Sequence, residues 1–471
     1  MSHKLALSSE IFKIISLASK ELNIQSYVIG GFVRDFLLKR GTAKDIDIVA
    51  VGSGIELAQK VAELLPNKPK VQVFKTYGTA MLRYKDVEVE FVGARKESYT
   101  EDSRNPAVIE GTLEDDQNRR DFTINALALS LNETDYGELL DPFQGIKALE
   151  GKIIKTPLNP DVTYSDDPLR MMRAIRFSSQ LNFTIEEESL LAISRNAHRL
   201  KIITLERVID ELNKIITAEQ PSKGFKLLFN TELLHQFFPE FVALHGVETI
   251  QGKKHKDNFY HTLEVLENLA KNTNDLWLRW AALLHDIAKP PTKRFEEGHG
   301  WTFHGHEFLG SKMVPKIFKR LKLPLNEKMK YVQKLVLLHL RPIVLSKDIV
   351  SDSAIRRLLF DAGEDVEDLM LLCEADITSK NEVKVKRFLN NFKIVRQKLK
   401  DIEERDHIRN WQPPISGELI MQTFNMEPGK LVGDLKNAIR EAILDGVITN
   451  DYEKAFEFML TKAKELGLKE H

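Results

Sequence analysis

The stretch "KDIDIVAVG", from Lys44 to Gly52, places two acidic residues two positions apart in a run of isoleucine, valine and alanine. In a β-strand, side chains at positions i and i+2 leave the same face, so Asp45 and Asp47 should point side by side. Two neighbouring carboxylates repel each other, and removing them from water costs further free energy. A solvated edge strand would tolerate the pair, whereas a buried strand requires a cation between them. We expect the buried strand and the cation.

The composition is that of a globular protein without a global preference for nucleic acid. Of the 471 residues, 42% are hydrophobic and 29% are charged, and this length allows roughly three domains. The 68 Lys and Arg residues nearly balance the 69 Asp and Glu residues, so any nucleic-acid partner must meet local basic surfaces. A single cysteine, Cys373, excludes an internal disulfide framework and favours the cytoplasm. The first 24 residues contain no apolar run of signal-peptide or membrane-spanning length, which predicts no membrane partner.

Two kinds of periodicity divide the chain. Up to about residue 145, the apolar runs "YVIGG" and "KDIDIVAV" alternate with the helical patterns "FVRDFLLKR" and "GIELAQKVAELL". Residues 71–94 predict a hairpin-like pair of strands. From about Ser165 onward the strand signals fade, and apolar residues recur three and four positions apart. The sequence therefore predicts an α+β multidomain protein in which a small mixed sheet with helices is followed by mostly α-helical parts.

A pair of glycines precedes the acidic strand. In "VIGGFVRDFLL", Gly30 and Gly31 follow a predicted strand and open a predicted helix. Adjacent glycines let a ligand approach the backbone, the start of a helix presents free N–H groups to a phosphate, and Arg34 adds positive charge. Taken alone, the glycines are better explained by a tight turn. Followed by two carboxylates on one face, they give the layout that holds Mg²⁺ against a triphosphate.

A second acidic alternation follows in "VEVEF", which contains Glu88 and Glu90. Either residue could complete the metal site, and surface charge on a hairpin is an equally good explanation. We take Glu90 as the third catalytic carboxylate.

Seven stretches occur in order, mostly in the first half of the chain: "GGFVRD", "KDIDIV", "GARKESY", "RRDFTINALAL", "LLDPFQGIKALEGKIIKTP", "DDPLRMMRAIRFSSQLNF" and "ERVIDELNKI". Together they resemble the motif series of class II tRNA nucleotidyltransferases, the family of CCA-adding enzymes and their poly(A) polymerase relatives. The resemblance implies a polymerase-β-like nucleotidyltransferase head and a helical neck. It also implies template-independent addition of C, C and A to the 3′ end of tRNA, from CTP and ATP.

The resemblance assigns roles to residues of these motifs. Asp45 and Asp47 would hold two Mg²⁺ ions for attack of the tRNA 3′-hydroxyl on the α-phosphate. Asp121 would meet the ribose 2′-hydroxyl. Arg119 and Arg120 could instead be a solvated pair before a helix. The implied nucleotide-binding set is Gly30, Gly31, Arg34, Arg120, Asp121, Asp167, Arg170, Arg173 and Arg176.

Base selection without a template can be argued from "DDPLRMMR". Cytosine and adenine present an amino donor beside a ring-nitrogen acceptor, whereas uracil and guanine present a carbonyl beside a ring N–H. Asp167 can only accept and Arg170 can only donate, and three residues apart on a helix they would share a face. The alternative is that Asp167 only caps the helix that begins at Pro168. The family usually has Glu at the position of Asp166, which leaves the role of that residue open.

A second constellation lies in the second half of the chain, in "FYHTLEVL", "AALLHDIAKPP", "WTFHGHEFLGSKM", "LVLLHLRP" and "EADI". Imidazole and carboxylate side chains suit divalent transition metals such as Ni²⁺ or Mn²⁺. The series, expected on helices, resembles the HD phosphohydrolase domain that follows the head in some bacterial CCA-adding enzymes. By that resemblance the ligands are His261, His285, Asp286 and Asp376, with His306 and His339 for a second ion.

Other features of this half remain open. Lys289 stands where the superfamily often has a lysine that faces phosphate, and His304 is expected only to pack or hydrogen-bond locally. Such a centre could hydrolyse 2′,3′-cyclic phosphates on RNA ends, or it could be a residual structural metal site.

These observations predict a head over residues 1–145, a neck over 146–230, an HD domain over 231–400 and a tRNA-binding tail over 401–471. The basic residues of the tail are too sparse to establish RNA binding by themselves. Complete CCA addition is favoured because the loop after the metal motif is intact and the tail is not strongly basic. The alternatives are a poly(A) polymerase, an HD phosphohydrolase whose head only binds nucleotide, and a non-catalytic RNA-binding protein. The expected partner is tRNA and not DNA, and the oligomeric state is left open.

Overall fold

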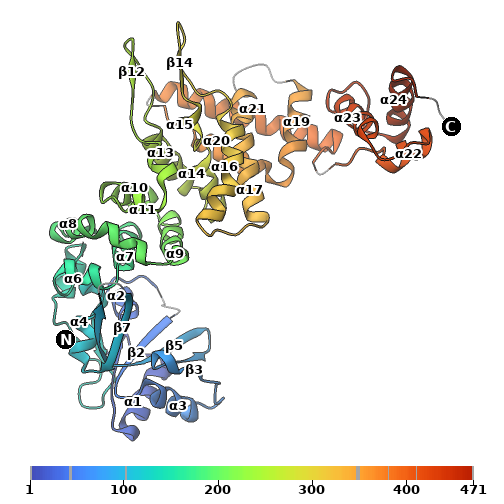
Figure 1. Cartoon of the computed structure of the whole chain (residues 1–471). Coiled ribbons are helices and arrows are strands. Elements are labelled where there is room, and N and C mark those ends of the chain that lie inside the picture. The colour runs from blue at the N-terminus through green and yellow to red at the C-terminus, as the bar shows by residue number, and fades with distance from the viewer. Residues whose placement is uncertain are drawn as a thin grey trace. The chain divides into compact units, whose positions relative to one another are not determined.

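The computed structural model describes residues 3–41, 45–100, 103–345, 351–379, 381–409 and 411–468. The chain folds as two compact units, Met1–Pro239 and Glu240–His471 (Figure 1). The first unit contains a mixed sheet with helices and the second is almost wholly helical. The predicted α+β multidomain class is confirmed. The division into four domains expected from the sequence stays a prediction.

The first unit is built on a seven-stranded sheet with the order β3-β4-β5-β2-β1-β8-β9. Strands β2 and β5 run parallel, and the other neighbouring pairs run antiparallel. The strands are β1 (Gln25–Ile29), β2 (Asp45–Val51), β3 (Gln72–Phe74), β4 (Thr79–Tyr84), β5 (Val87–Gly93), β8 (Ala128–Ser130) and β9 (Leu139–Leu140).

Strand β2 is central, because it lies between β1 and β5, and its Ile46, Ile48 and Val49 are buried. The alternative of a solvated edge strand is therefore wrong. Residues 71–94 form three antiparallel strands, β3, β4 and β5, and not a pair. A short 3₁₀ turn ends at Gly78, which has φ +64°, and separates β3 from β4.

Helices α1 (Glu10–Leu22) and α3 (Gly54–Leu64) pack against each other, and α3 also lies against β2, β4 and β5 (Figure 1). The remaining helices of the unit are α2 (Gly31–Leu37), α4 (Leu113–Asn118), α5 (Gly145–Glu150), α6 (Pro160–Asp166), α7 (Leu169–Leu181), α8 (Glu187–Asn196), α9 (Leu205–Ile216), α10 (Pro221–Asn230) and α11 (Leu233–Phe237). Two further strand pairs are β6 (Arg95–Thr100) with β7 (Ser103–Glu110), and β10 (Ile153–Ile154) with β11 (Thr184–Ile185). The stretch after the metal motif, expected to be a loop, thus contains the β6–β7 hairpin.

The second unit consists of helices and two short hairpins. The three- and four-residue spacing of apolar residues predicts the helices but not the hairpins. Its helices are α12 (Pro239–Val242, beginning at the last residue of the first unit), α13 (Asn258–Ala270), α14 (Leu276–Leu284), α15 (Lys289–Thr292), α16 (His306–Arg320), α17 (Glu327–Leu338), α18 (Leu340–Leu345), α19 (Asp352–Ala362), α20 (Val366–Ala375), α21 (Glu382–Asp406), α22 (Gly417–Phe424), α23 (Lys430–Leu444) and α24 (Tyr452–Glu465). The hairpins pair β12 (Thr249–Ile250) with β13 (Lys253–Lys254) and β14 (Arg294–Glu296) with β15 (Gly300–Thr302). Within the described residues, no helix is long and apolar enough to cross a bilayer.

The packing of α10 on α7 and α9 depends on Gly224. A Cβ atom at this position would lie 2.5 Å from Ser179 Oγ and would also overlap Ile215. Gly433, within α23, is exposed, and a Cβ atom there would meet no described neighbour outside its own helix within 4 Å. Gly224 and Gly433 therefore provide a test position and its control, because both lie in helices and only Gly224 is closely packed.

We expect Gly224→Ala to lower the free energy of unfolding by about 1–3 kcal/mol, because the added methyl group must displace two packed helices. Gly433→Ala should be neutral or stabilising by up to about 1 kcal/mol, since alanine is the better helix former. Urea unfolding followed by circular dichroism measures both. Equal effects of the two substitutions would contradict the packing described here.

Candidate active site and metal centre

The acidic pair of the opening stretch lies on one face of β2. The parallel register with β5 places Asp45 opposite Glu88 and Asp47 opposite Glu90. Residues paired across two strands leave the sheet on the same face, so the four carboxylates gather on one side. Asp45, Glu88 and Glu90 are exposed, and Asp47 is half-buried.

The electrostatics of this face fit a divalent cation. Burial raises the pKa of Asp47; Arg120 opposes this rise, and the charge of Asp45 adds to it. Burial also raises the pKa of Glu90, and the charge of Asp47 adds to this effect. Burial and mutual repulsion therefore disfavour the charged forms of these carboxylates, and a divalent cation would offset both effects. Carboxylate oxygens are the ligands that Mg²⁺ prefers, and the donor set fits this ion.

The glycine turn approaches this carboxylate face closely. Gly30 has φ +81°, and a Cβ atom there would lie 3.1 Å from Arg120 Nη1 and 3.5 Å from Asp47 Oδ2. Both the backbone conformation and the lack of space therefore require glycine at this position. Gly31 begins α2, and a Cβ atom there would make only an ordinary contact of 3.7 Å with Arg34. The requirement for glycine is strict only at Gly30.

A cavity of about 340 Å³ brings nine of the predicted site residues together. These nine are Gly30, Gly31, Arg34, Asp45, Asp47, Arg120, Asp121, Arg173 and Arg176. Phe32, Asp35, Asn125 and Phe177 complete the lining and were not predicted. Glu90, Asp167 and Arg170 are not part of the lining. The cavity combines two carboxylates of β2 with four arginines, a charge pattern that suits a metal-bound polyphosphate.

Three of these arginines surround one aromatic ring. The guanidinium carbons of Arg34, Arg173 and Arg176 lie 4.9, 5.4 and 4.2 Å from the centroid of the Phe177 ring. Burial lowers the pKa of Arg176 to about 10 in spite of its ion pair with Glu211 at 2.7 Å. The cation–π contacts with Phe177 and the ion pair with Glu211 therefore hold three guanidinium groups close together in spite of their mutual repulsion.

Asp121 is fixed by hydrogen bonds on both of its oxygens. Arg173 Nε donates to Oδ2 at 2.7 Å, and Asn125 Nδ2 donates to Oδ1 at 3.0 Å. Burial alone would raise the pKa of Asp121, but Arg173 and Asn125 outweigh it and lower the pKa to about 2. The carboxylate is therefore ionised and held in one orientation, with lone pairs left to accept a further hydrogen bond.

The side chains of Asp167 and Arg170 hydrogen-bond to the backbone. Arg170 donates to the carbonyl oxygen of Arg119 at 2.7 Å and to that of Thr163 at 3.3 Å. Asp167 Oδ1 accepts from the Leu169 amide at 3.2 Å, which resembles the capping role considered as the alternative. The template role of this pair stays a prediction.

Asp116 is a buried carboxylate that the sequence analysis missed. Arg119 Nε donates to Oδ1 at 2.9 Å, and Arg120 Nη2 donates to Oδ2 at 3.1 Å. Arg119 also pairs with Glu97 at 3.3 Å. The two arginines are therefore not a solvated pair, and Asp116 holds Arg120 against Gly30. The i,i+3 and i,i+4 spacing in "DQNRR" was the available signal.

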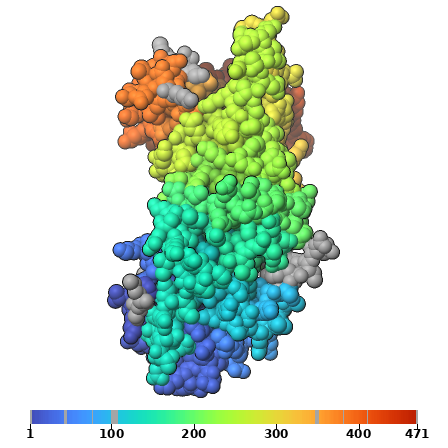
Figure 2. Space-filling view, turned by 90° about the vertical axis from the view of Figure 1, so that its left-hand side faces the viewer, coloured from blue at the N-terminus to red at the C-terminus, as the bar shows by residue number. Residues whose placement is uncertain are grey.

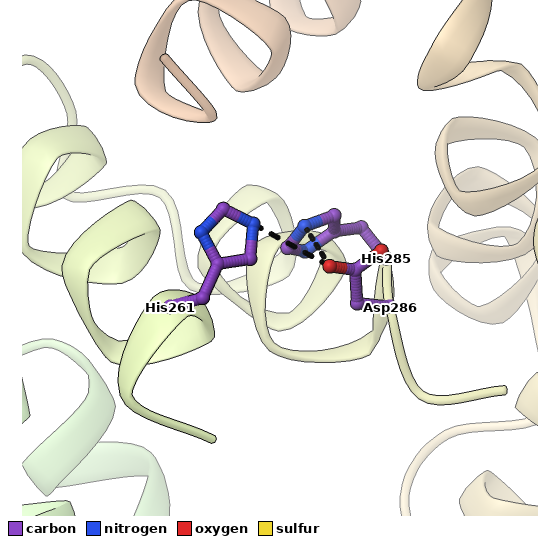
Figure 3. Close-up of side chains that lie close together, drawn as sticks. All are labelled: His261, His285 and Asp286. Carbon is purple, nitrogen blue, oxygen red and sulfur yellow. Dashed lines mark ion pairs between the residues drawn. The ribbon is translucent and has the colours of Figure 1, made fainter. Parts of the chain in front are cut away.

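The second unit contains the predicted cluster of four histidines and two aspartates, part of which Figure 3 shows. His261 lies within α13 and His306 is the first residue of α16. Three other members of the cluster are C-cap residues: His285 of α14, His339 of α17 and Asp376 of α20. They were expected on helices and stand at helix ends instead. Because a helix C-terminus carries partial negative charge, three such ends together favour a cation.

Asp286 divides the cluster into two donor groups. Its Oδ2 lies 3.4 Å from His261 Nε2 and 3.2 Å from His285 Nε2. Its Oδ1 lies 3.3 Å from His306 Nε2 and 3.9 Å from His339 Nε2. Each group offers at least three donor atoms that lie within 4.8 Å of one another.

Asp376 extends the first of these groups. Its Oδ1 lies 2.9 Å from His261 Nε2 and 3.7 Å from His285 Nε2. The two donor groups share Asp286 and could hold a divalent ion each, which would supply Lewis-acid chemistry.

The orientation of the imidazole rings supports metal binding. The Nδ1 atoms of His285, His306 and His339 lie 2.7–2.8 Å from the carbonyl oxygen three residues earlier, which fixes the proton on Nδ1 and leaves Nε2 free to coordinate. His285 Nε2 and His306 Nε2 are buried and make no hydrogen bond among the described residues. Each such orphaned nitrogen costs about 1–3 kcal/mol, and a metal ion in each of the two donor groups would satisfy both.

Two lysines stand beside this metal centre. Lys289 Nζ lies 2.7 Å from Asp286 Oδ2, at the position where the sequence predicts a phosphate-facing lysine. Lys256 Nζ lies 3.0 Å from His261 Nδ1 and contacts Thr378, and the sequence analysis missed it. His304 is 82% exposed and contacts only Glu296, at 3.5 Å, among the described residues. It therefore takes no part in the cluster.

Family models match three segments of the chain. Residues 26–155 match the poly(A) polymerase head domain, residues 182–244 the probable RNA and SrmB-binding site of polymerase A, and residues 258–381 the HD domain. The carboxylates of β2 lie in the first segment, and the histidine cluster lies in the third.

Curated relatives and solved structures agree with these matches. The chain is 38% identical to a CCA-adding enzyme of Anoxybacillus flavithermus over 46% of this chain and 53% of that enzyme. It is 33% identical to an A-adding tRNA nucleotidyltransferase of Deinococcus radiodurans, over 70% of this chain and 75% of that protein. The alignment covers only 44% of an A-adding enzyme of Aquifex aeolicus, so the chain spans about half the length of some of these relatives.

A crystal structure of the Bacillus stearothermophilus CCA-adding enzyme in complex with CTP has the same fold. The TM-score is 0.66 at 23% identity, and the comparison covers 98% of this chain and 99% of that chain. The chain therefore belongs to the class II tRNA nucleotidyltransferases, the family of CCA-adding enzymes and their poly(A) polymerase relatives, and it carries an HD domain.

Proposed function

We propose that this protein adds C, C and A to the 3′ end of tRNA from CTP and ATP, without a nucleic-acid template. The observation that carries the proposal is the position of Asp45 and Asp47 side by side on a central strand, at a cavity lined by four arginines. The tRNA 3′-hydroxyl would attack the α-phosphate in line, and pyrophosphate would leave. Names of relatives such as "CCA-adding enzyme" support the same reaction.

The residues of the cavity have separable tasks in this reaction. Two Mg²⁺ ions on Asp45, Asp47 and Glu90 would activate the 3′-hydroxyl and neutralise the triphosphate. Arg34 and Arg120 would orient the phosphates, and the rigid glycine turn leaves room for them. Asp121, ionised and fixed by Arg173, would accept a hydrogen bond from the ribose 2′-hydroxyl and so favour NTP over dNTP.

Asp167 and Arg170 would choose the base. An incoming cytosine or adenine would replace the Leu169 amide as the partner of Asp167 and the Arg119 carbonyl as a partner of Arg170. Uracil and guanine present the opposite pattern and would leave both side chains unpaired, which a buried site discriminates strongly.

The HD centre suggests a second activity, a metal-dependent phosphohydrolase. The two buried imidazole nitrogens beside Asp286 that lack hydrogen bonds favour a bound metal over a purely packed core. Ni²⁺ or Mn²⁺ would suit the histidine-rich donor set and would supply an activated water molecule. Lys289 and Lys256 would take up the negative charge of a phosphate such as a 2′,3′-cyclic phosphate at an RNA end. We place the tRNA contacts in the neck and tail, and the protein in the cytoplasm.

The first test supplies purified protein and Mg²⁺ with tRNA that ends at the discriminator base. We expect two cytidines with CTP alone and a complete CCA end with CTP and ATP together, as read on sequencing gels. Addition of one adenosine only to tRNA that already ends in CC would indicate an A-adding enzyme. A long adenosine tail would indicate a poly(A) polymerase, and no extension would leave the HD phosphohydrolase as the main function.

The carboxylates are tested one at a time. Asp45→Asn and Asp47→Asn should each reduce nucleotide incorporation on the order of a thousandfold, because each removes a ligand of a metal that supplies several kcal/mol of transition-state stabilisation. Glu90→Gln should reduce kcat more than Glu88→Gln, which changes the neighbouring exposed carboxylate of the same strand. Full incorporation by the Asp47→Asn variant in single-turnover assays would refute the proposed mechanism.

The HD centre is tested by its metal content. His306→Ala should lose at least one bound Ni²⁺ or Mn²⁺ per chain in equilibrium dialysis, because His306 Nε2 points at Asp286. His304→Ala, two residues away and exposed, is the matched control and should bind as the wild type does. CCA addition should be unchanged in both variants. Identical metal content in His306→Ala and the wild type would mean that the cluster is not the binding site.

A further inference from the structure

Two hairpins of the second unit carry side chains that neither the polymerase site nor the metal cluster uses. Strands β13 and β15 contact each other, so the hairpins β12–β13 and β14–β15 lie side by side. Figure 1 shows both projecting beyond the neighbouring helices, and in Figure 2 this part of the chain forms the yellow-green protrusion at the top. Short strands that leave a helical body and bury little core suggest a surface with a function of its own.

Aromatic rings gather on these hairpins. The centroid of the Trp301 ring lies 5.1 Å from that of His255 and 5.4 Å from that of Phe295, and His255 lies 6.0 Å from Phe303. Trp301 is only half-buried, and its Nε1 donates to the Lys253 carbonyl oxygen at 3.1 Å, which fixes the ring. A fixed and partly exposed aromatic face of this kind is suited to stacking a nucleobase.

Lysines accompany the rings. Lys293 Nζ lies 5.5 Å from the Trp301 centroid, and Lys289 Nζ lies 5.6 Å from the Phe303 centroid. The segment 253–256, "KKHK", adds three lysines, all of them exposed. Lys293 is ion-paired with Glu248, and Glu296 accepts from the Thr302 hydroxyl, so the exposed positive charge comes mainly from the lysines of residues 253–256. The balance favours a chain of phosphates, since each is a single negative charge.

Ring contacts and two lysines connect this surface to the cluster of histidines and aspartates. Trp301 contacts His255, His255 contacts Phe303, and Phe303 lies beneath Lys289, whose Nζ pairs with Asp286. Lys256 joins the same region from the other hairpin, because its Nζ reaches His261. A strand whose bases stack on the rings would therefore deliver its terminal phosphate to Asp286.

We infer that this hairpin surface, consisting of residues 253–256 with Lys289, Lys293, Trp301 and Phe303, binds the single-stranded 3′ end of an RNA chain. The HD centre then prefers the terminal phosphate of an oligonucleotide, which the hairpin surface binds, over that of a free nucleotide, which it does not. This substrate class rests on the phosphohydrolase proposed above, whereas the binding of RNA by the hairpins does not.

The binding test uses the full-length protein and a uridine octamer that ends in a 2′,3′-cyclic phosphate and carries 4-thiouridine next to its 3′ end. With EDTA present to prevent cleavage, fluorescence anisotropy of the labelled octamer should show binding weakened about tenfold in Trp301→Ala, the loss expected for one stacked base. Trp301→Phe keeps an aromatic face and should restore most of the affinity. Trp277→Ala, at a half-buried tryptophan of α14, is the control and should bind as the wild type does. Photocrosslinks should fall in residues 253–256 and 301–303.

The hydrolysis test compares the octamer with 2′,3′-cyclic UMP in the presence of Mn²⁺. Trp301→Ala should raise KM about tenfold for the octamer and leave kcat and the cyclic UMP reaction unchanged. Unaltered octamer binding by Trp301→Ala, or crosslinks confined to residues 1–239, would overturn the inference. Turnover of neither substrate together with Trp301-dependent binding would refute the hydrolase and uphold the RNA surface.

Discussion

The structure depends on one electrostatic constraint, which is that carboxylates held close together and partly removed from water need a cation. On β2 the constraint appears as Asp45 and Asp47 beside Glu90, where burial and mutual repulsion raise the pKa of Asp47. In the second unit it appears as Asp286, buried among imidazole nitrogens that lack hydrogen bonds. In both places a divalent ion would offset the cost of holding the carboxylates together and away from water.

The protein answers this constraint in two ways. In the first unit, arginines around Phe177 and the pair held by Asp116 surround the carboxylates with fixed positive charge. Arg120 partly offsets the negative charge of Asp47, and the four arginines of the cavity suit the charge of a triphosphate. In the second unit the imidazole rings are locked by backbone carbonyls, so their free nitrogens converge on one carboxylate.

Sequence reasoning found the residues whose spacing records their geometry. The alternation of Asp45 and Asp47 predicted a shared face, and the ordered motifs predicted most of the cavity lining. Residues whose role comes from tertiary contact could not be found in this way. Phe177 and Asn125 follow no periodic signal, and the helical spacing of Asp167 and Arg170 says nothing of the Arg119 carbonyl that Arg170 contacts from 51 positions away. Lys256 was missed because it lies outside every recognised motif. Three residues of the metal cluster were expected on helices and stand at helix ends instead. A local sequence pattern predicts that a helix exists better than it predicts the last residue of that helix.

Each reactive cluster is assembled from within a single compact unit, the cavity from residues before 239 and the metal centre from residues after 240. Natural selection can therefore act on the two clusters independently. Under the proposed function, substitution of the histidines in the second cluster would leave every residue of the cavity in place, and the reverse holds as well. The division of the chain into two compact units is therefore also a division between the two clusters, which can change separately in evolution.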